Sequence, residues 1–190
     1  MSAARALAEG GRLWTLVNFA LLQGTWFGCV LGAAAGRVEW AWACGAAALA
    51  THFALLRERR ADLRMVAAAV ALGAVVETVC RGVGAVEARG DPFPAPLAPS
   101  WFLVLWAVFG TTIRHSLSWL RGRLVLAAAF GAVGAPLSLL GGARLGAVHV
   151  ADDPLLFWGA CGAAWAVALP LLVALAERLR PGDAPRAANA

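Results

Sequence analysis

The sequence predicts an all-α integral membrane protein: a six-helix transmembrane bundle with both termini in the cytoplasm. Of its 190 residues, 61% are hydrophobic and 14% charged, whereas about a quarter of the residues in soluble domains are charged. Apolar runs recur along the chain, and a helix of roughly 20 apolar residues crosses a hydrocarbon core of about 30 Å. We therefore expect a cytoplasmic segment at 1–12, a transmembrane domain at 13–177 and a polar, disordered cytoplasmic tail at 178–190.

Turn and helix-start signals divide the apolar part of the chain. The short stretch "GRVE" separates the first two spans, and the loop "EARGDPFPAPLAPS" holds four of the nine prolines. Proline has no N–H and breaks helices, so this loop must lie outside the hydrocarbon. Ser100 and the pair Asp153 and Pro154 are typical of helix starts. The expected spans are residues 13–35, 38–56, 63–84, 100–120, 124–145 and 154–175.

The arginines predict the orientation, because short cytoplasmic loops collect positive charge. With the N-terminus inside, the inner segments hold Arg5, Arg12, Arg57, Arg59, Arg60, Arg64, Arg121, Arg123, Arg178, Arg180 and Arg186. The outer segments hold Arg37, Arg81, Arg89 and Arg144, and Arg114 lies inside a span. We expect a multi-pass protein of the bacterial inner membrane that meets anionic lipid. The arginines form no single patch, so no nucleic-acid partner is expected.

The first span could instead be a cleaved signal peptide ending near "GAAAG". Its apolar run is longer than a signal sequence requires and contains Asn18 and Gln23, so a membrane helix is the better interpretation. Small residues recur four apart in this span, at Gly24, Gly28, Gly32 and Gly36. Such a stripe lets another backbone approach closely in lipid. We expect an internal helix–helix contact there, with a homodimer contact as the alternative.

Polar side chains within the spans are the candidate functional residues, because each is costly in lipid and normally faces the protein interior. Asn18, His52, Arg114 and His115 fall at one depth, in the cytoplasmic third, and we call this set the polar layer. Thr111, His115 and Ser118 fall at i, i+4 and i+7, so we expect a polar stripe along the fourth span. Such a layer could accept an anionic headgroup or carboxylate, with Arg114 supplying the charge and His115 a titratable hydrogen bond. Arg114 could also simply extend to the headgroups.

Two other sets of residues suggest structural roles. Glu77 and Arg81 are four residues apart in the third span, and we expect them to form a neutral pair near the outer surface. The four cysteines fall one per span with no Cys-x-x-Cys spacing, so they are interpreted as small buried residues. The sequence matches none of the named catalytic, phosphate-binding or dinucleotide motifs, and we expect no metal and no cofactor.

Four stretches of the chain resemble a known family: "NFALLQGTWFGCVLG", "RRADLR", "LWAVFGTTIRHSLSWL" and "GAPLSLLGGARLGAV". In this order and spacing they are similar to the bacterial inner-membrane family catalogued as domain of unknown function 2878, over about residues 12–178. The most specific part is the run Thr-Thr-x-x-His-Ser-x-x-Trp-Leu, in which Arg114 stands where the family more often has Asn. The resemblance implies a compact polytopic membrane protein without an assigned activity, often encoded among genes for fatty-acid modification.

Three functions remain open from the sequence. The first is binding of an acidic lipid or fatty-acyl group at the polar layer, with membrane lipids as partners and a homo-oligomer or a partner membrane protein also possible. The second is a small enzyme of lipid modification that uses His115 as acid and base. The third is a small-solute transporter, which ranks last because the two three-helix halves show no convincing inverted repeat.

Overall fold

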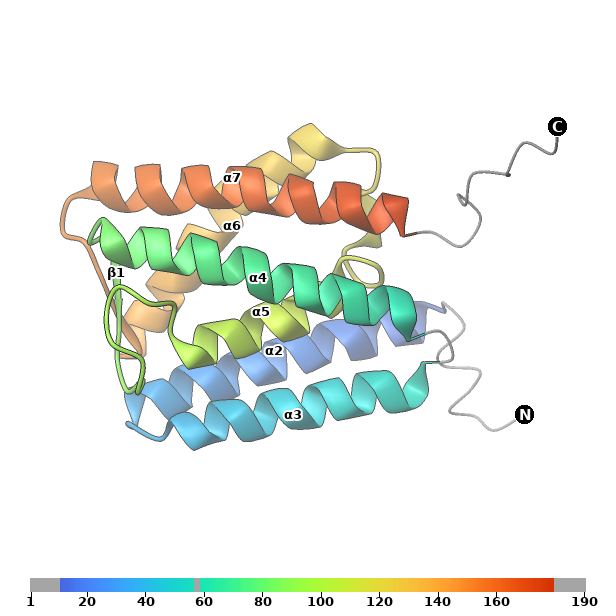
Figure 1. The fold of residues 1–190 in the computed structure, drawn as a ribbon, viewed down its shortest axis with the longest axis horizontal. Helices are drawn as coiled ribbons and strands as arrows, with labels where there is room; N and C mark the ends of the chain where they lie inside the picture. The colour runs from blue at the N-terminus through green and yellow to red at the C-terminus, as the bar shows by residue number, and fades with distance from the viewer. Residues whose placement is uncertain (1–10, 57–58, 180–190) are drawn as a thin grey trace, which may run out of the picture.

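Figure 1 shows the computed structural model, which describes residues 11–56 and 59–179. The elements are α2 (Arg12–Ala34), α3 (Val38–Leu55), α4 (Arg60–Gly82), β1 (Val86–Ala88), α5 (Ser100–Thr112), the 3-10 helix η1 (Ser118–Leu120), α6 (Leu124–Arg144), β2 (Val148–Val150) and α7 (Pro154–Arg178). Most of the two terminal segments expected at 1–12 and 178–190 lies outside the described residues. So do Arg5, Arg57, Arg180 and Arg186.

The helices pack in two groups. α2 and α3 pack together, and α5 packs against both of them and against α4. α6 and α7 form the second group, which joins the first chiefly where α7 meets α4. In Figure 1, α6 crosses obliquely behind α4 and α7. As a result, α2 and α6 touch at only a few points and are not packed along their lengths.

Four helices, α2, α4, α6 and α7, are long enough and apolar enough to cross a membrane. α3 has 18 residues, but Glu39, His52 and two tryptophans lower its mean hydropathy. α5 has only 13 residues and covers about 20 Å, less than a hydrocarbon core of about 30 Å. The prediction of a helical fold with membrane-type helices is confirmed, and the six crossings stay a prediction.

The prediction of one continuous helix over residues 100–120 is wrong, because α5 ends at Thr112. The carbonyl of Thr112 accepts the N–H of Leu117 at 2.8 Å, a wider turn than the α-helix makes. The N–H of Ser116, which would continue the helix, donates instead to Oδ1 of Asn18 on α2 at 3.3 Å. Non-helical backbone at membrane depth is tolerated where protein groups satisfy it, and here Asn18 does so.

The broken helix changes the positions of the three residues expected on one stripe. Thr111 lies in the last turn of α5, His115 in the turns that follow, and Ser118 in η1. The hydroxyl of Ser118 makes no hydrogen bond within the described residues, whereas Thr111 and His115 contact other helices. The predicted helical stripe is therefore not formed.

Two short strands tie together the end of the bundle opposite the start of α2. β1 follows α4 and pairs antiparallel with β2, which precedes α7; Val86 lies opposite Val150 and Ala88 opposite Val148. The proline-rich loop between β1 and α5 is non-helical, as its prolines predict. The sequence analysis did not anticipate the strands, since each has only three residues.

The glycines of the first span do not act as one packing stripe. A Cβ at Gly28 would lie 2.4 Å from the sulfur of Cys44, and one at Gly32 would lie 2.8 Å from the carbonyl oxygen of Arg37. Because they lack a Cβ, both glycines let α3 and the turn before it approach α2 closely. Gly24 meets nothing within 4 Å, and Gly36 lies beyond the helix with a φ of +68°. The internal contact therefore involves only the middle pair.

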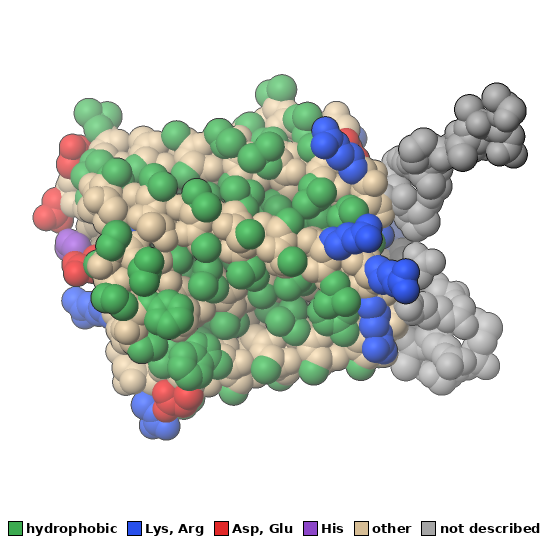
Figure 2. Space-filling view, in the orientation of Figure 1, with side chains coloured by type: hydrophobic (Ala, Val, Ile, Leu, Met, Phe, Trp, Pro, Cys, Tyr) green, Lys and Arg blue, Asp and Glu red, His purple; other side chains and the backbone are tan. Residues whose placement is uncertain are grey.

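Charged side chains differ between the two ends of the bundle (Figure 2). Arginines dominate the end where α2 begins and α7 ends: among the described residues these are Arg12, Arg59, Arg60, Arg64, Arg121, Arg123 and Arg178. Acidic residues gather at the opposite end, where four arginines also lie. These acidic residues are Glu39, Glu87, Asp91, Asp152 and Asp153. On the face shown in Figure 2, the flank between the two ends carries apolar side chains, uncharged polar side chains and backbone.

Candidate functional site

A polar cluster lies inside the bundle near its arginine-rich end, where α2, α3, α4 and the segment after α5 meet. Most of its members are buried, and His115 and Arg114 are only 16% and 17% exposed in their side chains. Its members are Trp14, Asn18, His52, Asp62, Thr111, Arg114, His115 and Ser116.

Asn18 is the centre of this polar cluster and is fully buried. Its Oδ1 accepts the hydroxyl of Ser116 at 2.7 Å in addition to the backbone N–H of that residue. Because a backbone N–H can only donate, this contact identifies Oδ1, and the amide nitrogen is then the donor. That nitrogen donates to the hydroxyl oxygen of Thr111 at 3.2 Å and faces Nδ1 of His52 at 3.5 Å.

His115 lies against the interior of the bundle. The indole N–H of Trp14 donates to Nδ1 of His115 at 3.0 Å, so the hydrogen of the neutral ring is on Nε2. Nε2 lies 3.3 Å from a carboxylate oxygen of Asp62. The rings of His115 and His52 have centroids 5.2 Å apart. His115 is therefore held between an indole donor and a buried carboxylate.

Asp62 is 2% exposed and supplies the negative charge of the polar cluster. The guanidinium nitrogen NH1 of Arg114 lies 3.6 Å from Oδ1 of Asp62, longer than a normal hydrogen bond. Oδ1 of Asp62, NH1 of Arg114 and Nε2 of His52 are buried without a hydrogen-bond partner. The polar cluster therefore holds two potential donors and one acceptor that lack a partner in the described part of the protein.

Within the described residues, His52, Asp62 and His115 form the group that could hold a metal ion, because their ligand atoms lie within 4.8 Å of one another. A metal-bound imidazole donates the N–H of its other nitrogen to an acceptor. Here the other nitrogens face donors instead, the indole of Trp14 and the amide of Asn18. This hydrogen-bonding pattern disfavours a metal at these atoms, and the absence of a metal stays a prediction.

The structure brings together most of the residues that the depth argument grouped, namely Asn18, His52 and His115. The sequence analysis missed Asp62 and Trp14. Asp62 lies in "RRADLR", where neighbouring charges made it resemble a solvated loop, and Trp14 resembled an interfacial anchor. The spacing from Trp14 to Asn18, one helical turn on one face, was the available signal.

Glu77 and Arg81 do not form the expected pair. Glu77 is 3% exposed, and its Oε1 accepts the indole N–H of Trp106 on α5 at 2.9 Å. Arg81 turns away and donates to the carbonyl of Leu97. Among the residues described, no ion pair and no second hydrogen bond involves Glu77. Spacing alone could not reveal this, because four residues separate the two side chains whether or not they meet.

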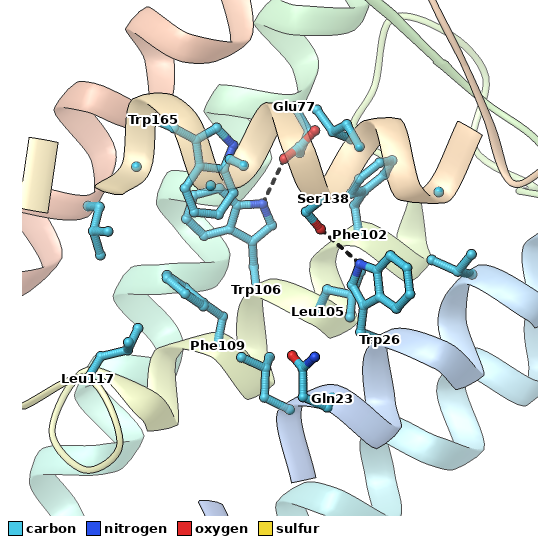
Figure 3. Close-up of a pocket in the computed structure, with 18 of the residues that line it drawn as sticks. Gln23, Trp26, Glu77, Phe102, Leu105, Trp106, Phe109, Leu117, Ser138 and Trp165 are labelled. Atoms are coloured by element: carbon cyan, nitrogen blue, oxygen red, sulfur yellow. Dashed lines mark hydrogen bonds between the residues drawn. The ribbon is translucent and has the colours of Figure 1, made fainter. Parts of the chain in front are cut away.

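A cavity of about 270 Å³ lies between α2 and α5 on one side and α6 and α7 on the other (Figure 3). Its wall is mostly aromatic and aliphatic, and the indoles of Trp106 and Trp165 stack there with centroids 4.3 Å apart. Phe19 and Phe130 line it and are 49% and 44% exposed. The exposure of these two side chains indicates that the cavity opens sideways between α2 and α6.

The cavity is long and narrow. Its lining runs from Phe19 to Val30 on α2 and from Phe130 to Gly142 on α6, or about 16–18 Å at 1.5 Å per residue. One end includes Ser116, a member of the polar cluster, and the other includes Glu77. Polar side chains are few within it, which is typical of sites for apolar ligands.

One comparison identifies the chain. The family model described as "Protein of unknown function (DUF2878)" matches residues 15–171. The chain belongs to this family. Within the described part of this DUF2878 protein, the match covers α3 to α6 in full, α2 without its first three residues and α7 up to residue 171. A search of curated proteins finds no match. A search of solved structures finds none.

Proposed function

We propose that this DUF2878 protein crosses the bacterial inner membrane six times, with both termini in the cytoplasm. The fourth crossing would run from Ser100 to Leu120 and consist of α5, the turns that follow it and η1. Its non-helical part can lie in the membrane because Asn18 accepts the backbone N–H of Ser116. The concentration of arginines at one end of the bundle supports this orientation.

We further propose that the protein holds one apolar chain of a membrane lipid, such as a fatty-acyl chain, in the lateral cavity. The observation that carries this proposal is the cavity's opening between α2 and α6, where a chain could enter directly from the bilayer. Its volume of about 270 Å³ lies near the lower limit for small-molecule sites of roughly 300 Å³. It suits a single chain and not a whole lipid. Partner membrane proteins or a homo-oligomer remain compatible with this role.

The polar cluster supports binding of an acidic headgroup less strongly than the sequence indicated, because Arg114 already faces Asp62. A second function has one observation in its favour. His115 contacts Asp62, an arrangement that orients an imidazole for acid–base chemistry, and Ser116 beside it lines the cavity. A lipid-modifying enzyme is therefore the alternative to pure binding.

Photolabelling tests the acyl-chain site. The purified protein in lipid nanodiscs is exposed to a long-chain fatty alcohol carrying a diazirine near the end of its chain, and labelled peptides are mapped. We expect labels on cavity-lining residues of α2, α5 or α6. Gly134→Phe should remove most of this labelling, because Gly134 lines the cavity and has free space at its Cβ.

Gly159→Phe is the matched control, since Gly159 also has free space but lies outside the cavity on α7. It should label as the wild type does. Labels confined to the lipid-facing surface, and unchanged by Gly134→Phe, would refute the acyl-chain site.

A further inference from the structure

We propose that the cavity selects an apolar amine, with Glu77 as the group that binds the ammonium. This inference rests on the proposed function, because it takes the cavity as the site for an apolar chain and adds the chemistry of the ligand's polar end.

Glu77 is the acidic residue of the cavity lining. It is 3% exposed, and within the described chain its one hydrogen bond is the indole N–H of Trp106 on Oε1. No hydrogen bond from the described residues reaches its second carboxylate oxygen, and Figure 3 shows the side chain at the cavity beside Trp106. An ionised carboxylate at membrane depth requires a cation or several donors beside it. The described part of the protein supplies neither, since Arg81 bonds to Leu97 instead.

The rest of the cavity suits a cation attached to an apolar body. Trp26, Trp106 and Trp165 line it, together with several phenylalanines. The faces of aromatic rings attract cations, and indole does so most strongly. An acid would place its carboxylate against Glu77, where two like charges repel each other. A simple alcohol could donate one hydrogen bond to Glu77 but would leave any charge there uncompensated.

An amine can also enter from the bilayer without a charge and become charged only at Glu77. An uncharged amine can leave the bilayer through the opening between α2 and α6 and then accept the proton of the Glu77 carboxyl group. The nitrogen gains the proton, the carboxyl group loses it and becomes a carboxylate, and the resulting ion pair has no net charge. The contact is a charge-assisted hydrogen bond in a water-poor site, where such bonds are strongest.

Three probes with the same chain test the inference: dodecylamine, dodecanol and dodecanoate. Their binding to the protein in nanodiscs is measured by isothermal titration calorimetry, with empty nanodiscs as the blank. We expect dodecylamine to bind about tenfold tighter than dodecanol or more, as for a hydrogen bond to a charged group. Dodecanoate should bind most weakly.

Glu77→Gln keeps an acceptor for Trp106 and removes the charge, so the preference for the amine should disappear while dodecanol binding is retained. Glu87→Gln is the control, because Glu87 lies on β1 outside the cavity. Equal binding of all three probes to the wild type, blocked by Gly134→Phe, would overturn the amine inference and leave the apolar-chain site standing. No saturable binding of any probe would overturn both. If Glu77→Gln does not fold, the ranking of the three probes on the wild type still decides the outcome.

Discussion

Replacement of Asn18 by leucine gives the sharpest test of how the fold is held together. Leucine has nearly the same size but cannot accept the two donors of Ser116. A buried donor left without a partner costs about 1–3 kcal/mol, while side-chain hydrogen bonds within membranes average about 0.6 kcal/mol. The Ser116 hydroxyl can rotate to another acceptor, but the backbone N–H cannot. We therefore expect the free energy of unfolding to fall by about 2–4 kcal/mol, with the unpaired backbone N–H contributing near the full cost of a buried donor.

For a chain of this length, that loss lowers the melting temperature by about 4–15 °C. The measurement is thermal unfolding in detergent, followed by near-UV circular dichroism. Thr25→Val is the matched control: Thr25 is also buried on α2, but its hydroxyl bonds only to the carbonyl of Leu21 in its own helix. It should melt within a few degrees of the wild type. If Asn18→Leu and Thr25→Val melt at the same temperature, Asn18 does not hold the broken segment after α5.

Three further predictions concern packing and topology. Gly28→Leu should lower the melting temperature because Cys44 occupies the space, whereas Gly24→Leu, with free space at its Cβ, should not; equal stability of the two variants would contradict the assigned contact. Gly131→Leu should destabilise the α6–α7 pair, because its Cβ would lie 2.3 Å from the carbonyl of Trp165, and unchanged melting would argue against that close approach. Reporter fusions at Ala95 and Asp183 should report opposite sides of the membrane, and a result on the same side would exclude six crossings.

The positions of the helices follow from the sequence because apolar length and turn residues are local signals. The fourth span shows a helix end that local signals do not predict. Residues 113–120 contain no proline or glycine that would end α5. The helix stops where Asn18, 98 residues away from Ser116 in the chain, takes the N–H that the next turn would use. A contact between distant segments cannot be read from the periodicity of either one.

The candidate sites differ in the same way. Comparing depths grouped Asn18, His52 and His115, which lie together in the structure, since the predicted helix directions place their side chains at calculable levels. The partner of His115 was missed because Asp62 lies in a charged stretch that resembles a loop. The cavity could not be predicted at all, because it exists through the oblique crossing of α6, and a crossing angle depends on side-chain packing between helices.

The break after α5 also explains why the polar cluster and the cavity adjoin. In a continuous helix, residues 113–120 would extend α5 in its own direction. The N–H of Ser116 would then bond to the carbonyl of Thr112 and not to Asn18. In the structure, Ser116 donates to Asn18 on one side while it and Leu117 line the cavity on the other. A chain bound in the cavity would therefore touch the segment that also carries His115. If a chain binds in the cavity, we therefore expect it to perturb the hydrogen bonds of Asn18 and Ser116, because both features share this non-helical segment.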